Sequence, residues 1–114
     1  MIDREKFRER FLRDPLPRRL GGLAATFGRI SSSARSSSDP VVVSDLLGEA
    51  RLLIEWTAGE IEPEAAAELV RIQTLLTLWQ KAWEIASKNP QQRLLLSLQA
   101  KDWSDKAVGY SGLV

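Results

Sequence analysis

One stretch of the sequence, residues 65–87, carries two apolar lines on what reads as a single long helix. The two lines together cover roughly 200° of a helix, about twice the stripe of an ordinary surface helix. A helix of this kind needs partners on two sides, so we expect it to be the centre of a small bundle. The first line has the four-and-three spacing of a heptad and consists of Ala65, Leu69, Ile72, Leu76, Trp79, Trp83 and Ala86. The second consists of Leu75, Leu78, Ala82 and Ile85.

The remaining segments have helical patterns that would surround this centre. The first 14 residues form a charged helical arm, with Asp3 as its N-cap and a stop at Asp14-Pro15. Asn89 is expected to close the central helix before Pro90. Short connections imply antiparallel neighbours. The sequence therefore predicts an all-α fold, an up-down four-helix bundle within the single domain 15–114, with helices at about 17–35, 40–60, 63–88 and 90–108. A serine-rich stretch, 31–38, would end in a linker.

Two pairs of apolar residues lie off the predicted core lines. Leu52 and Trp56 are four apart on the far side of the 40–60 helix, and Leu94 and Leu98 are four apart in the last helix. An isolated exposed leucine means little, but a leucine–tryptophan pair is a patch, and tryptophan is enriched at interface hot spots. The arm could cover the first patch with its two aromatic residues, Phe7 and Phe11. Alternatively, two copies could meet there. We expect a homodimer, because Leu94 and Leu98 add surface that one short arm cannot cover.

The absence of two residue types excludes much catalytic chemistry. The chain has no histidine and no cysteine, which removes histidine or cysteine metal sites and the Ser-His-Asp and Cys-His arrangements. Carboxylates cluster at 55–68, but without the spacing of a calcium loop, and complementing a helix dipole explains them. The glycines at 21–22 lack the pattern of a phosphate-binding loop. We therefore expect no enzymatic activity, catalytic residue, cofactor or metal.

Four tryptophans are many for 114 residues. Trp79 and Trp83 share one helix face, and Trp103 lies one helix away, so a cofactor pocket is one interpretation. Large rings also supply much of the buried area of a small core. We expect Trp79, Trp83 and Trp103 to serve the core.

Charge is divided unevenly along the chain. Residues 1–35 hold nine Arg or Lys against four acids, a net charge of +5, and residues 36–114 have a net charge of −4. A basic front can bind nucleic acid or an anionic surface through phosphate contacts. The acids Glu5 and Glu9 interrupt this front, and no recognition motif is present, so nucleic acid and membrane-surface binding are the alternative function. Its residues would be Arg4, Arg8, Arg10, Arg13, Arg18 and Arg19. The leading interpretation is a non-catalytic protein-interaction or assembly module.

Three stretches, IEWTAGE (54–60), LTLWQKAWEI (76–85) and NPQQRLLLSLQAKDWS (89–104), resemble those of short, uncharacterised all-helical proteins of cyanobacteria. The resemblance covers about residues 40–114. It implies a cytoplasmic or thylakoid-peripheral setting and no enzyme assignment. Independently, the charged N-terminus is unlike a secretory signal, and no run approaches the ~18 apolar residues of a membrane span. We expect the protein to be cytoplasmic.

Overall fold

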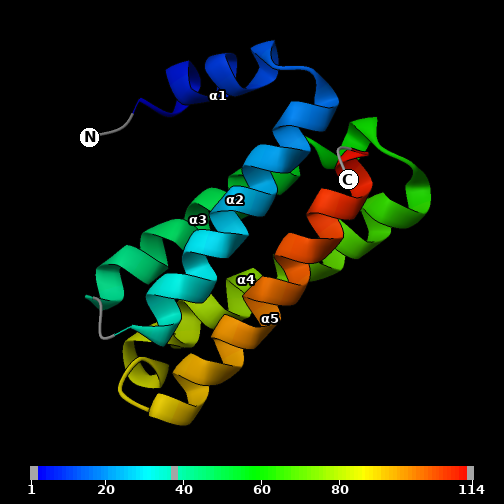
Figure 1. Ribbon diagram of the computed structural model, residues 1–114. Helices are drawn as coiled ribbons and strands as arrows, with labels where there is room; N and C mark the ends of the chain where they lie inside the picture. Colours follow the sequence, from blue (N-terminus) through cyan, green and yellow to red (C-terminus); the bar gives the residue numbers. More distant parts are fainter. Residues whose placement is uncertain (1–2, 37–38, 113–114) are drawn as a thin grey trace.

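The computed structural model describes residues 3–36 and 39–112, and in this part of the chain every regular element is a helix (Figure 1). The all-α prediction is confirmed. The predicted linker at residues 37–38 lies outside the described residues. The elements in chain order are α1 (Arg4–Arg13), α2 (Leu16–Arg35), α3 (Pro40–Glu55), a short 3₁₀ helix η1 (Ala58–Glu60), α4 (Pro63–Ala86) and α5 (Pro90–Ser111).

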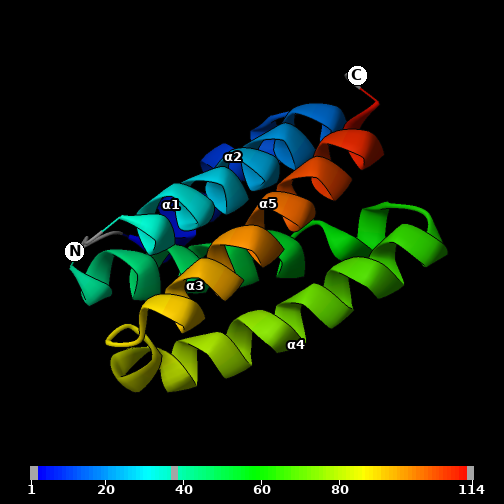
Figure 2. The ribbon, with the colours of Figure 1, turned by 60° about the horizontal axis from the view of Figure 1, so that its bottom comes forward.

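The four long helices lie alongside one another, and the chain direction alternates from each helix to the next (Figures 1 and 2). α2 packs most extensively against α5 and also contacts α3, while α3 packs against α4. α4 and α5 share fewer backbone contacts, and Figure 2 shows α4 at one edge of the molecule. α1 lies across one end, over α2 and α3 (Figure 1).

Side-chain caps fix where several helices begin. The carboxylate of Asp3 accepts hydrogen bonds from the backbone of the first turn of α1, and Asp39 accepts one from Val41 N at the start of α3. Asn89 caps the start of α5 by accepting from Gln91 N, so the prediction that it closes α4 was wrong. α4 instead ends at Ser87, and Pro90 begins the next helix almost at once.

Two predicted helix ends differ from the structure. The helix expected over 40–60 stops at Glu55, and its last residues form the separate turn η1. The last helix runs on past residue 108 to Ser111, where Gly112 closes it with a φ of 70°. That left-handed conformation costs glycine little because it has no Cβ.

The buried core follows the predicted lines. Leu69, Ile72, Leu76 and Trp83 of α4 are buried, as expected, while Trp79 is only partly buried. The apolar stripe of α2 is buried as well, and so are most of the core positions of α3 and α5. In the second apolar line of α4, Leu75 is partly buried, while Leu78, Ala82 and Ile85 are exposed. The other large core residues are Leu20, Leu23, Phe27, Ile30, Val43, Leu47, Leu53, Ile54, Leu96 and Trp103.

Small residues allow α2 and α5 to approach closely. Ser104 Oγ donates to the backbone carbonyl of Ala24 at 2.8 Å, and Ser31 Oγ donates to that of Ser97 at 2.8 Å. Gly28 faces Ser104 at the same contact. Bonds from a side chain of one helix to the backbone of another require a short separation, so small residues here explain the extensive contact between these two helices.

Two glutamines join α3 to α4. Gln73 Nε2 donates to the carbonyl of Arg51 at 3.0 Å, and Gln80 Nε2 donates to that of Ser44 at 3.0 Å. Gly48 leaves room for the second glutamine, because a Cβ at this position would lie 3.0 Å from Gln80 Nε2. These bonds hold the two helices in register.

Arg93 closes the opposite end of the molecule from α1. Its guanidinium donates to the carbonyls of Ala34, at the end of α2, and of Ser87, at the end of α4, at 2.9 and 3.2 Å. It also lies over the ring of Trp83, 5.3 Å from its centroid. A cation at two helix C-termini satisfies carbonyls that have no partner within their own helices and complements both helix dipoles.

Candidate protein-interaction surfaces

We group the second apolar line of α4 with two exposed leucines of α5 under one name, the outer face, because a hydrogen bond from Trp79 to Gln99 joins the two helices beside these residues. Leu78 is 57% exposed and Ile85 is 79% exposed, values unusual for such large apolar side chains. On α5, Leu95 and Leu98 are 43% and 54% exposed. Leu75, which is partly buried, and the exposed Ala82 complete the outer face on α4. α4 packs against both α3 and α5 of this chain but lies at one edge of the molecule, so the prediction that it forms the centre of the bundle was wrong. Three residues of its second apolar line, Leu78, Ala82 and Ile85, stay exposed.

One hydrogen bond fixes how α4 and α5 are aligned along their lengths. Trp79 Nε1 donates to Gln99 Oε1 at 2.8 Å. Leu78 and Leu98 are each adjacent in sequence to a bonded residue, so the bond brings these two leucines to the same height of the molecule. It also explains why Trp79 is only partly buried: its ring spans the gap between α4 and α5, and its polar edge meets the glutamine.

An ion pair joins the same helices nearer the other end. Lys106 Nζ of α5 lies 2.9 Å from Glu68 Oε1 of α4 and 3.2 Å from Asp102 Oδ2. The hydrogen bond from Lys106 lowers the pKa of Glu68, and the same bond is the main cause of a raised pKa for Lys106. Both groups therefore remain charged at neutral pH, and charges beside the outer face are paired within the chain.

The first predicted patch is covered by the arm. The ring of Phe7 lies edge-on to that of Trp56, with centroids 5.5 Å apart, and Phe11 lies at 6.0 Å. Leu52 and Trp56 are consequently only partly exposed. The sequence analysis favoured a second copy as the cover of this patch, but in the structure the arm lies on it, as in the alternative. Leu94 and Leu98, the other predicted interaction residues, are both more than half exposed.

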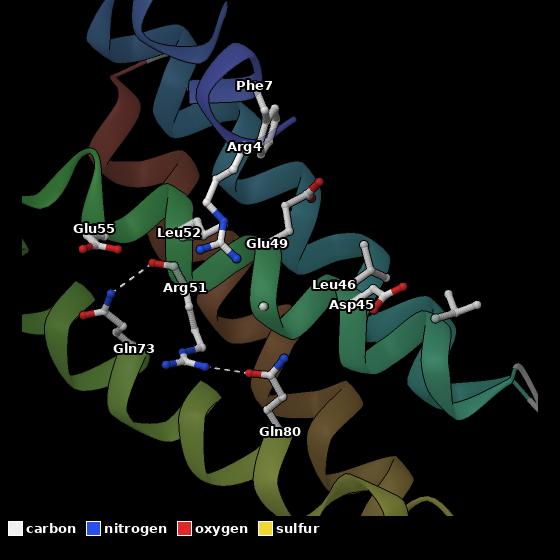
Figure 3. Close-up of a pocket in the computed structure, with 12 residues that line it drawn as sticks. Arg4, Phe7, Asp45, Leu46, Glu49, Arg51, Leu52, Glu55, Gln73 and Gln80 are labelled. Atoms are coloured by element: carbon white, nitrogen blue, oxygen red, sulfur yellow. Dashed lines mark hydrogen bonds between the residues drawn. The ribbon is translucent and has the colours of Figure 1, made fainter. Parts of the chain in front are cut away.

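A groove of about 930 Å³ runs beside this contact, along the outer side of α3 (Figure 3). Its apolar floor includes Val42, Leu46 and Leu52. Three acids of α3 line it as well: Asp45, Glu49 and Glu55. Glu49 already pairs with Arg29 at 3.0 Å, whereas Asp45 and Glu55 form no ion pair within the described residues. The arm closes one end of the groove with Arg4 and Phe7.

Arg51 stands in the wall of this groove, between α3 and α4 (Figure 3). Its Nη1 donates to Gln80 Oε1 at 2.7 Å, while its Nε is buried without a hydrogen-bond partner. This arginine forms no ion pair within the described part of the chain, so it offsets some of the acidity of the groove.

The six arginines of the predicted basic patch have different surroundings. Arg19 is 6% exposed and binds Glu60, so its guanidinium cannot reach an external phosphate. Arg18 lies 3.9 Å from Asp14 and is otherwise exposed. Arg4 borders the groove. The three that remain, Arg8, Arg10 and Arg13, are exposed on α1.

Two of the four tryptophans belong to the core. Trp83 and Trp103 are buried, and Trp103 packs edge-on against Phe27. Among the described residues, no group of three acids lies close enough to hold a metal ion. In the same part of the chain, no helix is both long and apolar enough to cross a membrane.

Comparison with family models, curated proteins and solved structures finds no match to this chain.

Proposed function

We propose that the protein is a non-catalytic assembly module, an up-down four-helix bundle that binds a second copy of itself through the outer face of α4 and α5. The observation that supports this most is the exposure of Leu78 and Ile85 on the same helix as the buried core. Several large apolar side chains gathered on one surface are typical of an interaction site rather than of ordinary surface variation.

The spacing of these residues suits a second helix pair as the partner. On α4, the steps between Leu75, Leu78, Ala82 and Ile85 are three, four and three residues, which is heptad spacing. On α5, Leu95 and Leu98 are likewise three residues apart. Helices with this spacing pack by inserting side chains of one helix into gaps of the other. A second copy supplies the same spacing, and most symmetric dimers use one patch on both subunits.

Charges on the α5 side of the outer face also favour self-association. Lys101 pairs with Asp105 at 3.2 Å, and Lys106 pairs with Asp102 and Glu68. Because these cations and anions are matched within one chain, two identical surfaces can meet here with little like-charge repulsion.

The exposed area sets the expected strength of the dimer. Full burial of a leucine or isoleucine side chain is worth about 1.5–3 kcal/mol, so covering the exposed parts of Leu78, Ile85, Leu95 and Leu98 is worth roughly 3–7 kcal/mol for each copy, or about 7–14 kcal/mol for the dimer. Association itself costs on the order of 4–15 kcal/mol. We therefore expect a reversible dimer that forms at micromolar or higher concentration, rather than a permanent one.

Single cysteines test the location of the contact, because the natural chain contains none. Leu78→Cys and Leu98→Cys should react more slowly with a maleimide as the protein is concentrated from low to high micromolar. Val41→Cys is the matched control, since Val41 is 60% exposed but lies on α3, away from the outer face. Equal reactivity of all three variants at every concentration would contradict the proposal.

A further inference from the structure

We propose that the groove along α3 is a second, separate binding site, which accepts a cationic amphipathic helix of a partner protein, and that the arm α1 is its built-in competitor. The groove and the outer face lie on different helices, so this proposal does not depend on the self-association proposed above. Three observations support this proposal. The chain packs its own arm beside the groove, the arm forms no polar bond to the bundle in the described chain, and two acids of the groove have no ion pair there.

The arm shows which kind of helix fits. Phe7 and Phe11 are one turn apart on α1, and both rings pack on Trp56. The other side chains of α1 are mainly charged, with more cations than anions. An amphipathic helix that places residues at i and i+4 in an apolar groove is a recurring mode of peptide recognition. The chain packs its own short helix on Trp56 with the same spacing, and Phe7 of that helix lines the end of the groove.

The arm is held by apolar contacts of its two rings. α1 buries no residue, and within the described part of the chain no hydrogen bond or ion pair joins Arg4–Arg13 to the helices of the bundle. The connection to α2 is short and contains Pro15. Segments with few buried contacts are those that open most readily. A competing helix therefore has to displace the apolar contacts of Phe7 and Phe11 but no polar bond in the described chain.

The arm also leaves most of the groove open. Val42 and Leu46 remain accessible beyond it, and Val42 is 44% exposed. Val42 and Leu52 are ten residues apart, which is about 15 Å of helix. The carboxylates of Asp45 and Glu55 lie along this length without an ion pair in the described chain. A longer helix with arginines or lysines beside its aromatic residues would cover the apolar floor and meet both acids, which gives it an advantage over the arm.

A labelled synthetic peptide of residues 1–14 is a suitable probe, because its two rings are already seen on Trp56. In the full chain, Phe7→Ala/Phe11→Ala should release the arm and expose the groove. We expect this variant to bind the peptide roughly tenfold more tightly than the wild type does, because a tethered competitor acts at an effective concentration in the millimolar range. Fluorescence anisotropy measures the affinity, and circular dichroism checks that the variant is folded.

Further substitutions, each added to the released variant, test the contacts. Trp56→Ala should weaken peptide binding by roughly tenfold or more, as loss of a tryptophan anchor does. Asp45→Asn should weaken it several-fold at low salt and less at high salt, since exposed charges are screened. Glu84→Gln, an exposed acid of α4 that does not line the groove, should have no effect.

Three results would overturn the proposal. The first is no peptide binding to the released variant at high micromolar concentration. The second is equal binding by the wild type and the released variant. The third is binding that Trp56→Ala leaves unchanged, which would mark unspecific charge attraction. If the double variant is unfolded, Phe7→Ala alone removes the closer ring contact and is compared with the wild type in the same way.

Discussion

The buried guanidinium of Arg19 binds both carboxylate oxygens of Glu60, with Nη1 to Oε2 at 2.7 Å and Nη2 to Oε1 at 2.9 Å. Its Nε donates to the carbonyl of Asp14 at 3.0 Å. One side chain thus ties together the residue that ends the arm, the first turn of α2 and the turn that follows α3. Paired hydrogen bonds of this kind are the strong form of an ion pair.

This pair predicts how stability depends on pH. The hydrogen bond from Arg19 lowers the pKa of Glu60 below its ordinary value of 4.5. A carboxylate with a lowered pKa stabilises the folded state above pH 4.5 and loses that contribution as the pH falls through the folded-state pKa. Glu60→Gln should therefore reduce the fall in stability below about pH 4.5, measured by urea unfolding across the acid range. An unchanged acid profile would show that the pair does not contribute in solution.

The two apolar lines of α4 predict opposite responses to truncation. Leu76 is fully buried, so Leu76→Ala should lower the free energy of unfolding by about 2–5 kcal/mol. Ile85 is 79% exposed, so Ile85→Ala should have little effect at low micromolar concentration, where we expect the proposed dimer to be dissociated. Urea unfolding of both variants tests this. Near-wild-type stability of Leu76→Ala would contradict the burial of this apolar line in the core.

The hydrogen bonds of Arg93 predict that lysine, which carries the same charge, cannot replace it without a loss of stability. The guanidinium reaches the last carbonyls of α2 and α4 because its planar fork carries several donors, whereas lysine has one compact ammonium. Arg93→Lys should therefore destabilise the protein by about 1–3 kcal/mol, the range for hydrogen bonds to charged groups. Thermal unfolding measures the effect. An equally stable lysine variant would show that only the charge matters at these helix ends.

Much of this fold follows from local sequence signals. Heptad spacing identifies the buried residues of α4, and proline after Asp39, Glu62 or Asn89 marks where three helices begin. Asn89 was assigned to the wrong helix because both a C-terminal and an N-terminal cap favour asparagine, and the two helices are separated by only three residues. Local patterns cannot decide between two such neighbouring roles.

The candidate surfaces could be predicted less well from the sequence. Arg19 belongs to a run of basic residues, and only the distant Glu60 removes it from the surface. The cover of Trp56 likewise depends on where the arm turns after Pro15, which no periodicity encodes. The exposed and the buried residues of α4 form apolar lines of the same kind. The sequence therefore indicates that both lines can pack against a partner, but it does not tell which line packs within the chain and which stays exposed.

The exposed arginines of α1 permit a test of the alternative function. Arg8, Arg10 and Arg13 alternate with acids, so we expect only weak, unspecific and strongly salt-dependent attraction to DNA or RNA. Arg8/Arg10/Arg13→Ala should abolish that attraction in an electrophoretic mobility assay without changing the sedimentation of the free protein. Submicromolar, sequence-specific binding by the wild type at physiological salt, lost in the variant, would favour a nucleic-acid function instead.

Self-association through the outer face is tested most directly by sedimentation equilibrium of the wild type, Leu78→Glu and Val41→Glu over low to high micromolar concentrations. Leu78 and Val41 are 57% and 60% exposed, so the two substitutions disturb the folded monomer to a similar small extent. We predict that the wild type and Val41→Glu form dimers as the concentration rises, and that Leu78→Glu stays monomeric because a carboxylate would be buried in the contact. A wild type that remains monomeric at high micromolar concentration, or a Leu78→Glu variant that dimerises as well as Val41→Glu, would contradict the proposal.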